Sequence, residues 1–506
     1  MYRSLAVVLG VVVLLCGCTR SNTSTPVEKP SGSALVRTDI PKPRTFLKKC
    51  LDDLEQDPLL KHASLSYLIA DVSTDSVIAA RNENLSLVPA STMKLFTTAA
   101  ALEILGPDIR FKTCLQYEGT ISGRTLHGNI IIKGGGDPTF CLNEQSMKLL
   151  LTNWSKAIRK TGIDTVDGSV IGDGRVFDQD YIPYTWTWGE INIGYCAAAS
   201  GLSVNGNVYQ MFFEPFKDRR FSSTLKKVTP LIPEELFFNQ TYGSETDEEL
   251  VFVLGHPQTN QKTIKGTVPK WKQEVSFYAT INNPPLATAM EFQNFLVMNG
   301  VVIKGKAMSV TDSDSLAERL KKAVIKDITS VSSPTLATII NTTNQASYNF
   351  FAENLLKHIG LKVMKHGGTE SGALSIRRYL ESKGMDMGGF AQFDGSGVSR
   401  FNTFTARQAV WLLRYMYSSP DSGVFIASLP IAGVSGTLSS ICFNTPARGN
   451  VHAKSGTMSR VKSYAGYAHT RSGKTLVFAL IANNFDGQSE EIKKLMGKIM
   501  DAMVLN

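Results

Sequence analysis

Beyond its first twenty residues, the sequence has no apolar run long enough for a membrane-spanning helix, which needs about 20 apolar residues. It also lacks a dense Lys/Arg block or a basic helical stripe, although its net charge is +9. The 53 basic and 44 acidic residues are scattered along the chain. This distribution indicates solubility and a mild preference for anionic surroundings, and it predicts no nucleic-acid partner.

Cysteine and histidine are sparse, with seven of each in 506 residues. The cysteine spacings match neither a disulfide framework nor a C-x-x-C metal site. The histidines are dispersed, without an H-E-x-x-H pattern, which disfavours a zinc peptidase. The G-x-S-x-G elbow of many Ser-His-Asp hydrolases is absent as well. We therefore predict neither a metal nor a cofactor.

The N-terminus has the pattern of an export signal. Arg3 precedes an apolar stretch over residues 5–15, too short to span a bilayer comfortably. The stretch runs into Leu15-Cys16-Gly17-Cys18, which resembles a bacterial lipobox. Residues 1–17 are then a signal peptide and Cys18 carries the lipid. The alternative is a plain secretory signal followed by two chance cysteines.

Residues 18–43 follow as the lipidated cysteine and a flexible tether rich in Ser, Thr and Pro. The predicted location is the periplasmic side of the cell envelope, with the protein anchored to a membrane by its lipid. Of seven cysteines, Cys16 is cleaved away and Cys18 is modified, which leaves five. An odd number cannot all pair, so at least one is predicted to be a buried free thiol.

Apolar periodicity divides the remaining chain into three parts. Residues 44–106 contain a helix, two strands and a second helix that starts after Pro89. Residues 107–275 consist mostly of short alternating runs with frequent Gly and Pro, which predict β structure. Residues 276–506 return to helices and end with three strands and a final helix. Strands at both ends predict one discontinuous domain, 44–106 plus 276–506, with 107–275 as an inserted, mostly β domain.

Ser91 and Lys94 stand three positions apart at the start of the helix after Pro89, so they share a face of its first turn. A lysine that is partly desolvated there is disfavoured as an ammonium, also because the helix N-terminus is positive. A neutral amine beside a hydroxyl is a general base beside a nucleophile. S-x-x-K alone is weak, however, because Ser223–Lys226 and Ser459–Lys462 match it too.

Two further elements strengthen the signal. Ser347-Tyr348-Asn349 lies between two predicted helices, and Lys454-Ser455-Gly456-Thr457 precedes two predicted strands. Other matches exist: Ser203-Val204-Asn205 is another S-x-N, and Lys160-Thr161-Gly162 matches K-T-G better by letter. The latter has the context of a capped helix end rather than of a strand. S-x-x-K, S-x-N and K-[ST]-G are together the signature of penicillin-binding proteins and class A β-lactamases. Here they occur in that order.

Residues 45–506 resemble a low-molecular-mass class C penicillin-binding protein, of the D-alanyl-D-alanine carboxypeptidase/endopeptidase family. Three features carry the resemblance: the sequence around the second element at Ser347–Asn349, a separate stretch at residues 393–402, and the long gap between Ser91 and Ser347. It implies an α/β (α+β) class, with a penicillin-binding/serine β-lactamase-like transpeptidase fold. This is an antiparallel sheet flanked by helices, here with the large, mostly β insertion. It also implies peptidoglycan stem peptides as substrates and β-lactams as covalent inhibitors.

The resemblance also implies roles for individual residues. Ser91 attacks the carbonyl between two D-alanines, and Lys94 takes its proton. Ser347 relays a proton to the leaving amine, and Asn349 hydrogen-bonds the substrate amide. The N–H groups of Ser91 and Thr457 form the oxyanion hole.

The third element binds the far side of the scissile bond by the same resemblance. Lys454 supplies positive potential for the terminal carboxylate, and Ser455 hydrogen-bonds it although Thr is commoner there. Gly456 belongs to the same strand. Arg400 and Asp173 are the candidates for holding the distal end of the stem peptide, and Asp173 fits a turn residue equally well.

Two other functions stay open. A serine β-lactamase uses the same nucleophile but needs fast deacylation, for which the long insertion gives no basis. A catalytically idle cell-wall-binding lipoprotein is the second alternative, and the presence of all five polar residues of the three elements argues against it.

Overall fold

The computed structural model describes residues 43–216, 222–230, 232–233, 236–247, 249–257, 259, 261–311 and 315–506. The predicted signal peptide and Cys18 lie outside these residues. Within them, no helix has the length and apolar character needed to cross a membrane. The five cysteines of this part are all free, and Cys50, Cys141 and Cys196 are buried, which confirms the prediction of a buried thiol.

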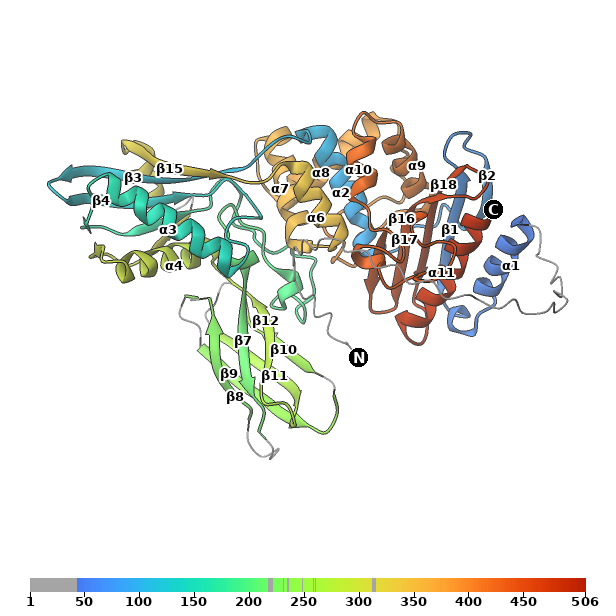
Figure 1. The fold of residues 1–506 in the computed structure, drawn as a ribbon, viewed down its shortest axis with the longest axis horizontal. Helices are drawn as coiled ribbons and strands as arrows, with labels where there is room; N and C mark the ends of the chain where they lie inside the picture. Colours follow the sequence, from blue (N-terminus) through green and yellow to red (C-terminus); the bar gives the residue numbers. More distant parts are fainter. Residues whose placement is uncertain are drawn as a thin grey trace, which may run out of the picture.

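Both ends of the described chain build one antiparallel sheet, in the order β16-β17-β18-β1-β2 (Figure 1). Its strands are β1 (Ser64–Asp71), β2 (Val77–Arg81), β16 (Val451–Met458), β17 (Val461–His469) and β18 (Thr475–Asn483). The predicted sheet assembled from both ends is therefore confirmed. β16, which carries Lys454-Ser455-Gly456-Thr457, is an edge strand.

Alternate residues of β1 face two separate cores, as the two-residue period of a strand dictates. Tyr67 and Ile69 pack with α1 (Pro43–Glu55) and α11 (Ser489–Leu505). Leu68 and Ala70 face the opposite core, which contains the helix that follows Ser91. Because helices cover both faces, β1 and β18 are buried along almost their whole length.

The second core is formed mainly by helices. They are α2 (Lys94–Leu105), α6 (Leu336–Gln345), α7 (Asn349–Met364), α8 (Thr369–Ser382), α9 (Ala406–Tyr417) and α10 (Ser422–Ser428). α2 is apolar on all sides and is buried over Lys94–Leu102, as expected for a helix inside a core rather than at its surface.

The insertion contains a larger mixed sheet, in which β13-β5-β4-β3-β15 are neighbours and β6 pairs with β4 and β14. Its strands are β3 (Lys112–Ser122), β4 (Thr125–Lys133), β5 (Thr165–Val166), β6 (Val170–Asp173), β13 (Val302–Ile303), β14 (Met308–Val310) and β15 (Ile325–Ser332). Its helices are α3 (Glu144–Lys160), α4 (Pro284–Met298) and α5 (Ser315–Lys322). Trp154 of α3 and Phe292 of α4 meet edge to face at 5.6 Å.

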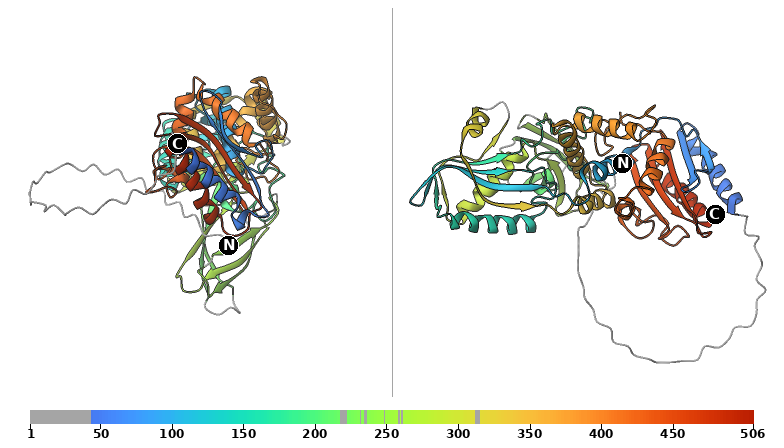
Figure 2. Two further views of the ribbon diagram at one scale, coloured as in Figure 1. Left: turned by 90° about the vertical axis from the view of Figure 1, so that its right-hand side faces the viewer. Right: turned by 90° about the horizontal axis from the view of Figure 1, so that it is seen from above.

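Two three-stranded sheets, β12-β7-β8 and β10-β11-β9, form an arm that projects from the rest of the molecule (Figures 1 and 2). Its strands are β7 (Val208–Glu214), β8 (Thr224–Thr229), β9 (Leu236–Ser244), β10 (Leu250–Leu254), β11 (Gln261–Pro269) and β12 (Val275–Thr280). Met211, Phe213 and Ile264 bury their side chains in the core that the arm shares with the larger inserted sheet.

The insertion extends further than the predicted boundary at residue 275. β15 pairs along β3, and β13 and β14 pair with β5 and β6. These strands complete the inserted sheet, so the return to the discontinuous domain falls after Ser332. We therefore propose a boundary near 332. β13 and β14, with two and three residues, are too short to show an alternating pattern, and β15 is recognisable as part of this sheet only through its pairing with β3.

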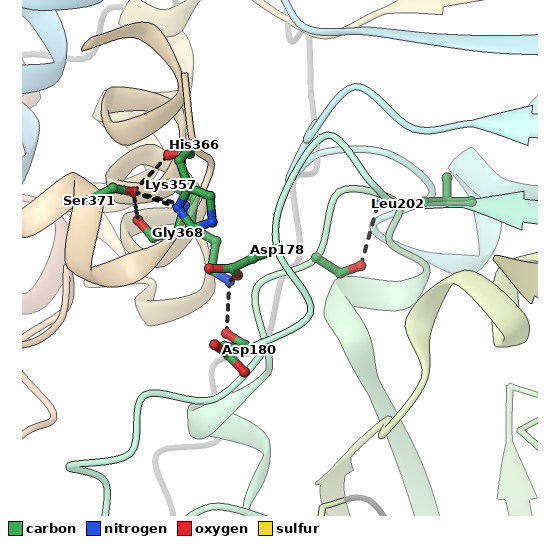
Figure 3. A network of polar contacts seen from close by, with 8 residues as sticks. Asp178, Asp180, Leu202, Lys357, His366, Gly368 and Ser371 are labelled. Atoms are coloured by element: carbon green, nitrogen blue, oxygen red, sulfur yellow. Dashed lines mark hydrogen bonds and ion pairs between the residues drawn. The ribbon is translucent and has the colours of Figure 1, made fainter. Parts of the chain in front are cut away.

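A polar junction connects the loop after β6 to α7 and α8 (Figure 3). Lys357 of α7 is 1% exposed. Its Nζ donates to Asp178 Oδ1 at 2.6 Å and to the backbone oxygen of Asp180 at 2.8 Å. Next to this pair, His358 stacks on Phe111 with ring centroids 3.7 Å apart. The insertion is thereby attached to the helical layer close to the site described next.

Candidate active site

The segment before Ser91 is held against the sheet by side chains of β17 and β18. Val88 N donates to Asn483 Oδ1 at 2.8 Å, and Asn483 Nδ2 donates back to Val88 O at 2.9 Å. Ser463 Oγ donates to Pro89 O at 2.6 Å. Ala90 then takes a left-handed φ of 50°, which turns the chain into a short 3₁₀ helix, Ala90–Met93. Ser91 therefore lies on a turn whose backbone is fixed on both sides.

Lys94 lies in the same pocket as Ser91, as the three-residue spacing predicts. Its Nζ donates to Ser91 Oγ at 3.1 Å, to Asn349 Oδ1 at 2.6 Å and to Ser396 O at 2.6 Å. The side chain is 0% exposed. All three acceptors are neutral, so no carboxylate contacts the amine directly.

Burial lowers the pKa of Lys94 to about 7, against the opposing effect of the charges on Asp394 and Glu353. A substantial fraction of Lys94 is then a neutral amine near pH 7, with a lone pair available to the Ser91 hydroxyl. This is the protonation state that a general base needs.

Two buried carboxylates support the oxygen that contacts Lys94. Glu353 of α7 accepts from Gly395 N at 3.0 Å and from Ser396 N at 2.8 Å. These bonds fix the two peptide groups that precede Ser396 O, and Asp394 holds the peptide group that carries this oxygen by accepting from Gly397 N. Burial and the neighbouring Asp394 raise the pKa of Glu353.

Asp394 organises the turn at 393–402. Its carboxylate accepts from Gly397 N at 2.7 Å and from Asn402 Nδ2 at 2.7 Å. It also accepts from the indole N–H of Trp186, a residue of the insertion, at 2.8 Å. These contacts make residues 393–402 a structural turn beside the cleft. The sequence motifs include neither Glu353 nor Trp186, although both support this turn. Trp186 lies near none of the three motifs, and Glu353, four residues after Asn349, lies outside the S-x-N motif itself.

Ser347 lies in the turn between α6 and α7 and has a left-handed φ of 54°. Lys454 Nζ, from the edge strand β16, donates to Ser347 Oγ at 2.8 Å and to Ser455 O at 2.8 Å. Burial, followed by the positive charges of Lys94 and Lys462, lowers the pKa of Lys454 well below its usual value. The second and third sequence elements thus meet in space.

Asn349 begins α7 and connects three parts of the molecule. Its Oδ1 accepts from Lys94, and its Nδ2 donates to Tyr195 O of the insertion at 2.9 Å. The insertion therefore contributes to the wall of the cleft. Ser91, Lys94, Ser347, Asn349 and Lys454 form a continuous group of neighbours, as predicted.

The third element approaches the nucleophile's turn through Gly456. A methyl group at this position would clash with Pro89 O and come within 3.1 Å of Ser91 N. Only glycine therefore lets β16 lie this close. Ser455 Oγ donates to Thr437 Oγ1 at 2.7 Å, and Thr457 Oγ1 accepts from Lys462 Nζ at 2.7 Å.

Two of the predicted site residues, Arg400 and Asp173, do not belong to this group of neighbours. Arg400 is exposed on the turn that follows Ser399. Asp173 ends β6 in the insertion, and its carboxylate accepts from Arg175 Nε at 2.9 Å and Nη2 at 2.8 Å. Among the described residues, no hydrogen bond connects Asp173 with the cleft, so its role remains a prediction.

The sequence model of the D-Ala-D-Ala carboxypeptidase 3 (S13) family matches residues 47–504. The chain belongs to the S13 family. One S13 relative, D-alanyl-D-alanine carboxypeptidase of Actinomadura sp. (strain R39), is 30% identical over 464 residues, which are 88% of this chain and 82% of that protein. D-alanyl-D-alanine carboxypeptidase DacB of Haemophilus influenzae is 24% identical over 468 residues, 91% of this chain and 94% of that one.

A solved structure shares the fold of this S13 chain. The crystal structure of penicillin binding protein 4 (dacB) from Haemophilus influenzae matches with a TM-score of 0.77 at 22% identity, covering 89% of this chain and 97% of that chain. The same protein complexed with a novel β-lactam matches with a TM-score of 0.73 at 21% identity. The predicted penicillin-binding fold is therefore confirmed.

Proposed function

We propose that this S13 protein is a serine-type D-Ala-D-Ala carboxypeptidase that acts on peptidoglycan stem peptides through an acyl-enzyme on Ser91. The observation that carries the proposal is the buried Lys94 amine, which lies 3.1 Å from Ser91 Oγ and has only neutral acceptors as hydrogen-bond partners in the described part of the chain. Membership of the S13 family and the D-alanyl-D-alanine carboxypeptidases among its relatives support the substrate class.

In the acylation step, Ser91 Oγ attacks the carbonyl carbon of the penultimate D-alanine while Lys94 accepts the hydroxyl proton. The Ser347 hydroxyl, held by Lys454 at 2.8 Å, relays a proton to the amine of the terminal D-alanine. The C–N bond breaks and free D-alanine leaves. Water then attacks the ester, which releases the shortened peptide and restores the Ser91 hydroxyl.

The tetrahedral intermediate needs donors for its oxyanion. We assign this role to the N–H groups of Ser91 and Thr457, which the close approach of Gly456 to Ser91 N brings towards each other. Lys454 and Ser455 bind the terminal carboxylate. Arg400 is the proposed contact for the distal stem peptide, and Asp173 could share that role only if it left Arg175.

β-Lactams present an acyl group and a carboxylate in the same relation as the D-Ala-D-Ala end. We therefore propose that they acylate Ser91 and inhibit the enzyme covalently. A serine β-lactamase would share this acylation but release the product quickly. Steady-state hydrolysis of a chromogenic β-lactam distinguishes the two, because a carboxypeptidase should give a burst of about one equivalent followed by slow turnover.

We further propose that residues 1–17 are removed and that Cys18 carries a lipid, which places the enzyme on the periplasmic side of the cell envelope. The lipobox-like Leu15-Cys16-Gly17-Cys18 supports this proposal. Replacement of Cys18 by Ser should then release the protein from the membrane fraction, whereas a plain secretory signal predicts no change.

The nucleophile is tested by labelling with a fluorescent penicillin. Native protein should be labelled and Ser91→Ala should not, and a band that persists in the variant would refute the assignment. Incubation with monomeric and cross-linked muropeptides then defines the reaction. Release of D-alanine without cleavage of dimers means a carboxypeptidase only, and dimer cleavage adds endopeptidase activity. A correctly folded native protein that neither labels nor releases D-alanine would favour the idle cell-wall-binding lipoprotein.

A further inference from the structure

Lys462 is a buried lysine on β17, next to the edge strand β16, and the mechanism above leaves it unused. It lies on β17 directly opposite Thr457 of β16 and is 7% exposed. The sequence presents it only as the end of a second S-x-x-K match, Ser459–Lys462. In the structure its Nζ donates to Thr457 Oγ1 at 2.7 Å and lies 5.2 Å from the centre of the Tyr464 ring.

The charge of Lys462 is not neutralised by an ion pair within the described part of the chain. The two charged groups that act electrostatically on Lys462 are Lys493 and Glu490, and they pair with each other at 3.1 Å. A buried cation without a counter-ion is costly, so such a group is retained where it has a use. Lys462 also acts electrostatically on Lys454, which contributes to the same end of the cleft.

The hydrogen bond from Lys462 determines what Thr457 can do. An ammonium group only donates, so the Thr457 oxygen is the acceptor and the hydroxyl proton must point elsewhere. Thr457 is exposed on the edge strand, and Ser455 shares its face two residues earlier. The free proton of Thr457 is therefore available to an anion placed between these two hydroxyls.

We infer that Lys462 is a positioning residue for the terminal carboxylate of the substrate: it orients the Thr457 hydroxyl as a donor and adds a positive charge behind it. The inference rests on the proposed function, because the anion is the carboxylate of the D-Ala-D-Ala end. Lys462 touches neither the scissile bond nor Ser91, so its effect belongs to substrate binding and not to the chemical step.

The inference is tested by Lys462→Met, which keeps the length of the side chain and removes the charge and the donor. With a peptide ending in D-Ala-D-Ala, KM should rise about tenfold or more while kcat changes less than about threefold. The same peptide with a C-terminal amide, which lacks the anion, should be turned over equally by native and variant enzymes. Lys493→Met is the matched control, since Lys493 contacts Ser440 and Glu490 instead of Thr457, and it should keep the native KM.

A double-mutant cycle separates positioning from simple support of the hairpin. If Lys462 acts through Thr457, Thr457→Val should raise KM selectively for the free acid, and adding Lys462→Met should cost little more. Fully additive losses, or an equal loss on acid and amide, would overturn the inference. If Lys462→Met does not fold, Lys462→Leu, a shorter side chain that also lacks the charge and the donor, should show the same selectivity for the acid.

The experiments distinguish a wrong function from a wrong role for Lys462. If the native enzyme releases no D-alanine and takes no penicillin label, the proposed function is wrong. If the native enzyme is active and Lys462→Met retains the native KM for the acid, the function stands and only the role of Lys462 is refuted.

Discussion

Lys94 in the cleft and Lys357 at the junction with the insertion are both buried, but their partners differ in charge. Lys357 contacts the Asp178 carboxylate at 2.6 Å (Figure 3). Lys94 contacts only a hydroxyl, an amide oxygen and a backbone oxygen. A carboxylate in contact favours the protonated amine, whereas neutral acceptors leave the proton exchangeable. The comparison indicates that Lys357 stabilises the junction with the insertion, whereas Lys94 is available for proton transfer in the cleft.

The largest effect should come from making the same substitution at both lysines. Lys94→Met removes the base, so acylation by a fluorescent penicillin should slow by about 10³-fold. Lys357→Met leaves the chemistry in place, and its acylation rate should stay within about threefold of native at a temperature where the variant is folded. Stopped-flow or time-resolved gel labelling measures both rates. Comparable losses in the two variants would remove the distinction between the regions.

The second effect concerns stability. Asp178→Asn leaves Lys357 buried without its counter-charge and should lower the free energy of unfolding by about 3 kcal/mol. Denaturant unfolding followed by tryptophan fluorescence measures this loss, and kcat for D-alanine release should be unchanged where the variant is folded. If Asp178→Asn is as stable as the native protein, the junction pair contributes no cohesion.

The third effect is the pH dependence of acylation. The pKa of Lys94 is lowered to about 7, so the reactive neutral amine becomes scarcer as the pH falls below that value. The acylation rate should fall about tenfold per pH unit below pH 6 and level off as the pH rises above about 8. Asp178→Asn should keep the same profile, since Asp178 pairs with Lys357 and not with Lys94. A flat profile between pH 5 and 8 would exclude Lys94 as the titrating base.

The smallest effect is expected for Ser455→Thr, on KM and kcat for the peptide substrate. Ser455→Thr adds one methyl group but keeps the hydroxyl that contacts Thr437. KM and kcat for a D-Ala-D-Ala peptide should each change less than about threefold, whereas Ser455→Ala removes the hydroxyl and should raise KM more. Equal behaviour of the Thr and Ala variants would show that this hydroxyl does not bind the carboxylate.

Local signals predicted most of the site. Ser91, Lys94 and Lys454 were identified through three motifs in the order of the family they resemble, and their helix and strand contexts distinguished them from other matches in the chain. The same reasoning could not identify Glu353 or Lys462, because their importance depends on which distant backbone or hydroxyl they contact. It also placed the end of the insertion too early, since β15 is recognisable as part of that sheet only through its pairing with β3. Asp173 was chosen from its strand-turn context, which does not reveal that Arg175 occupies the carboxylate.

The reciprocal pair of hydrogen bonds between Val88 and Asn483 spans 395 residues of chain. A nascent polypeptide that ends before Asn483 lacks both this clamp and the final sheet strand, although Ser91 has long since been synthesised. Partial chains should therefore be inert towards penicillin, and maturation should be slow because so many contacts are remote in sequence. Activity therefore depends on completion of the polypeptide. Ser91 is synthesised early, but it can react only after the C-terminal strand has folded against it.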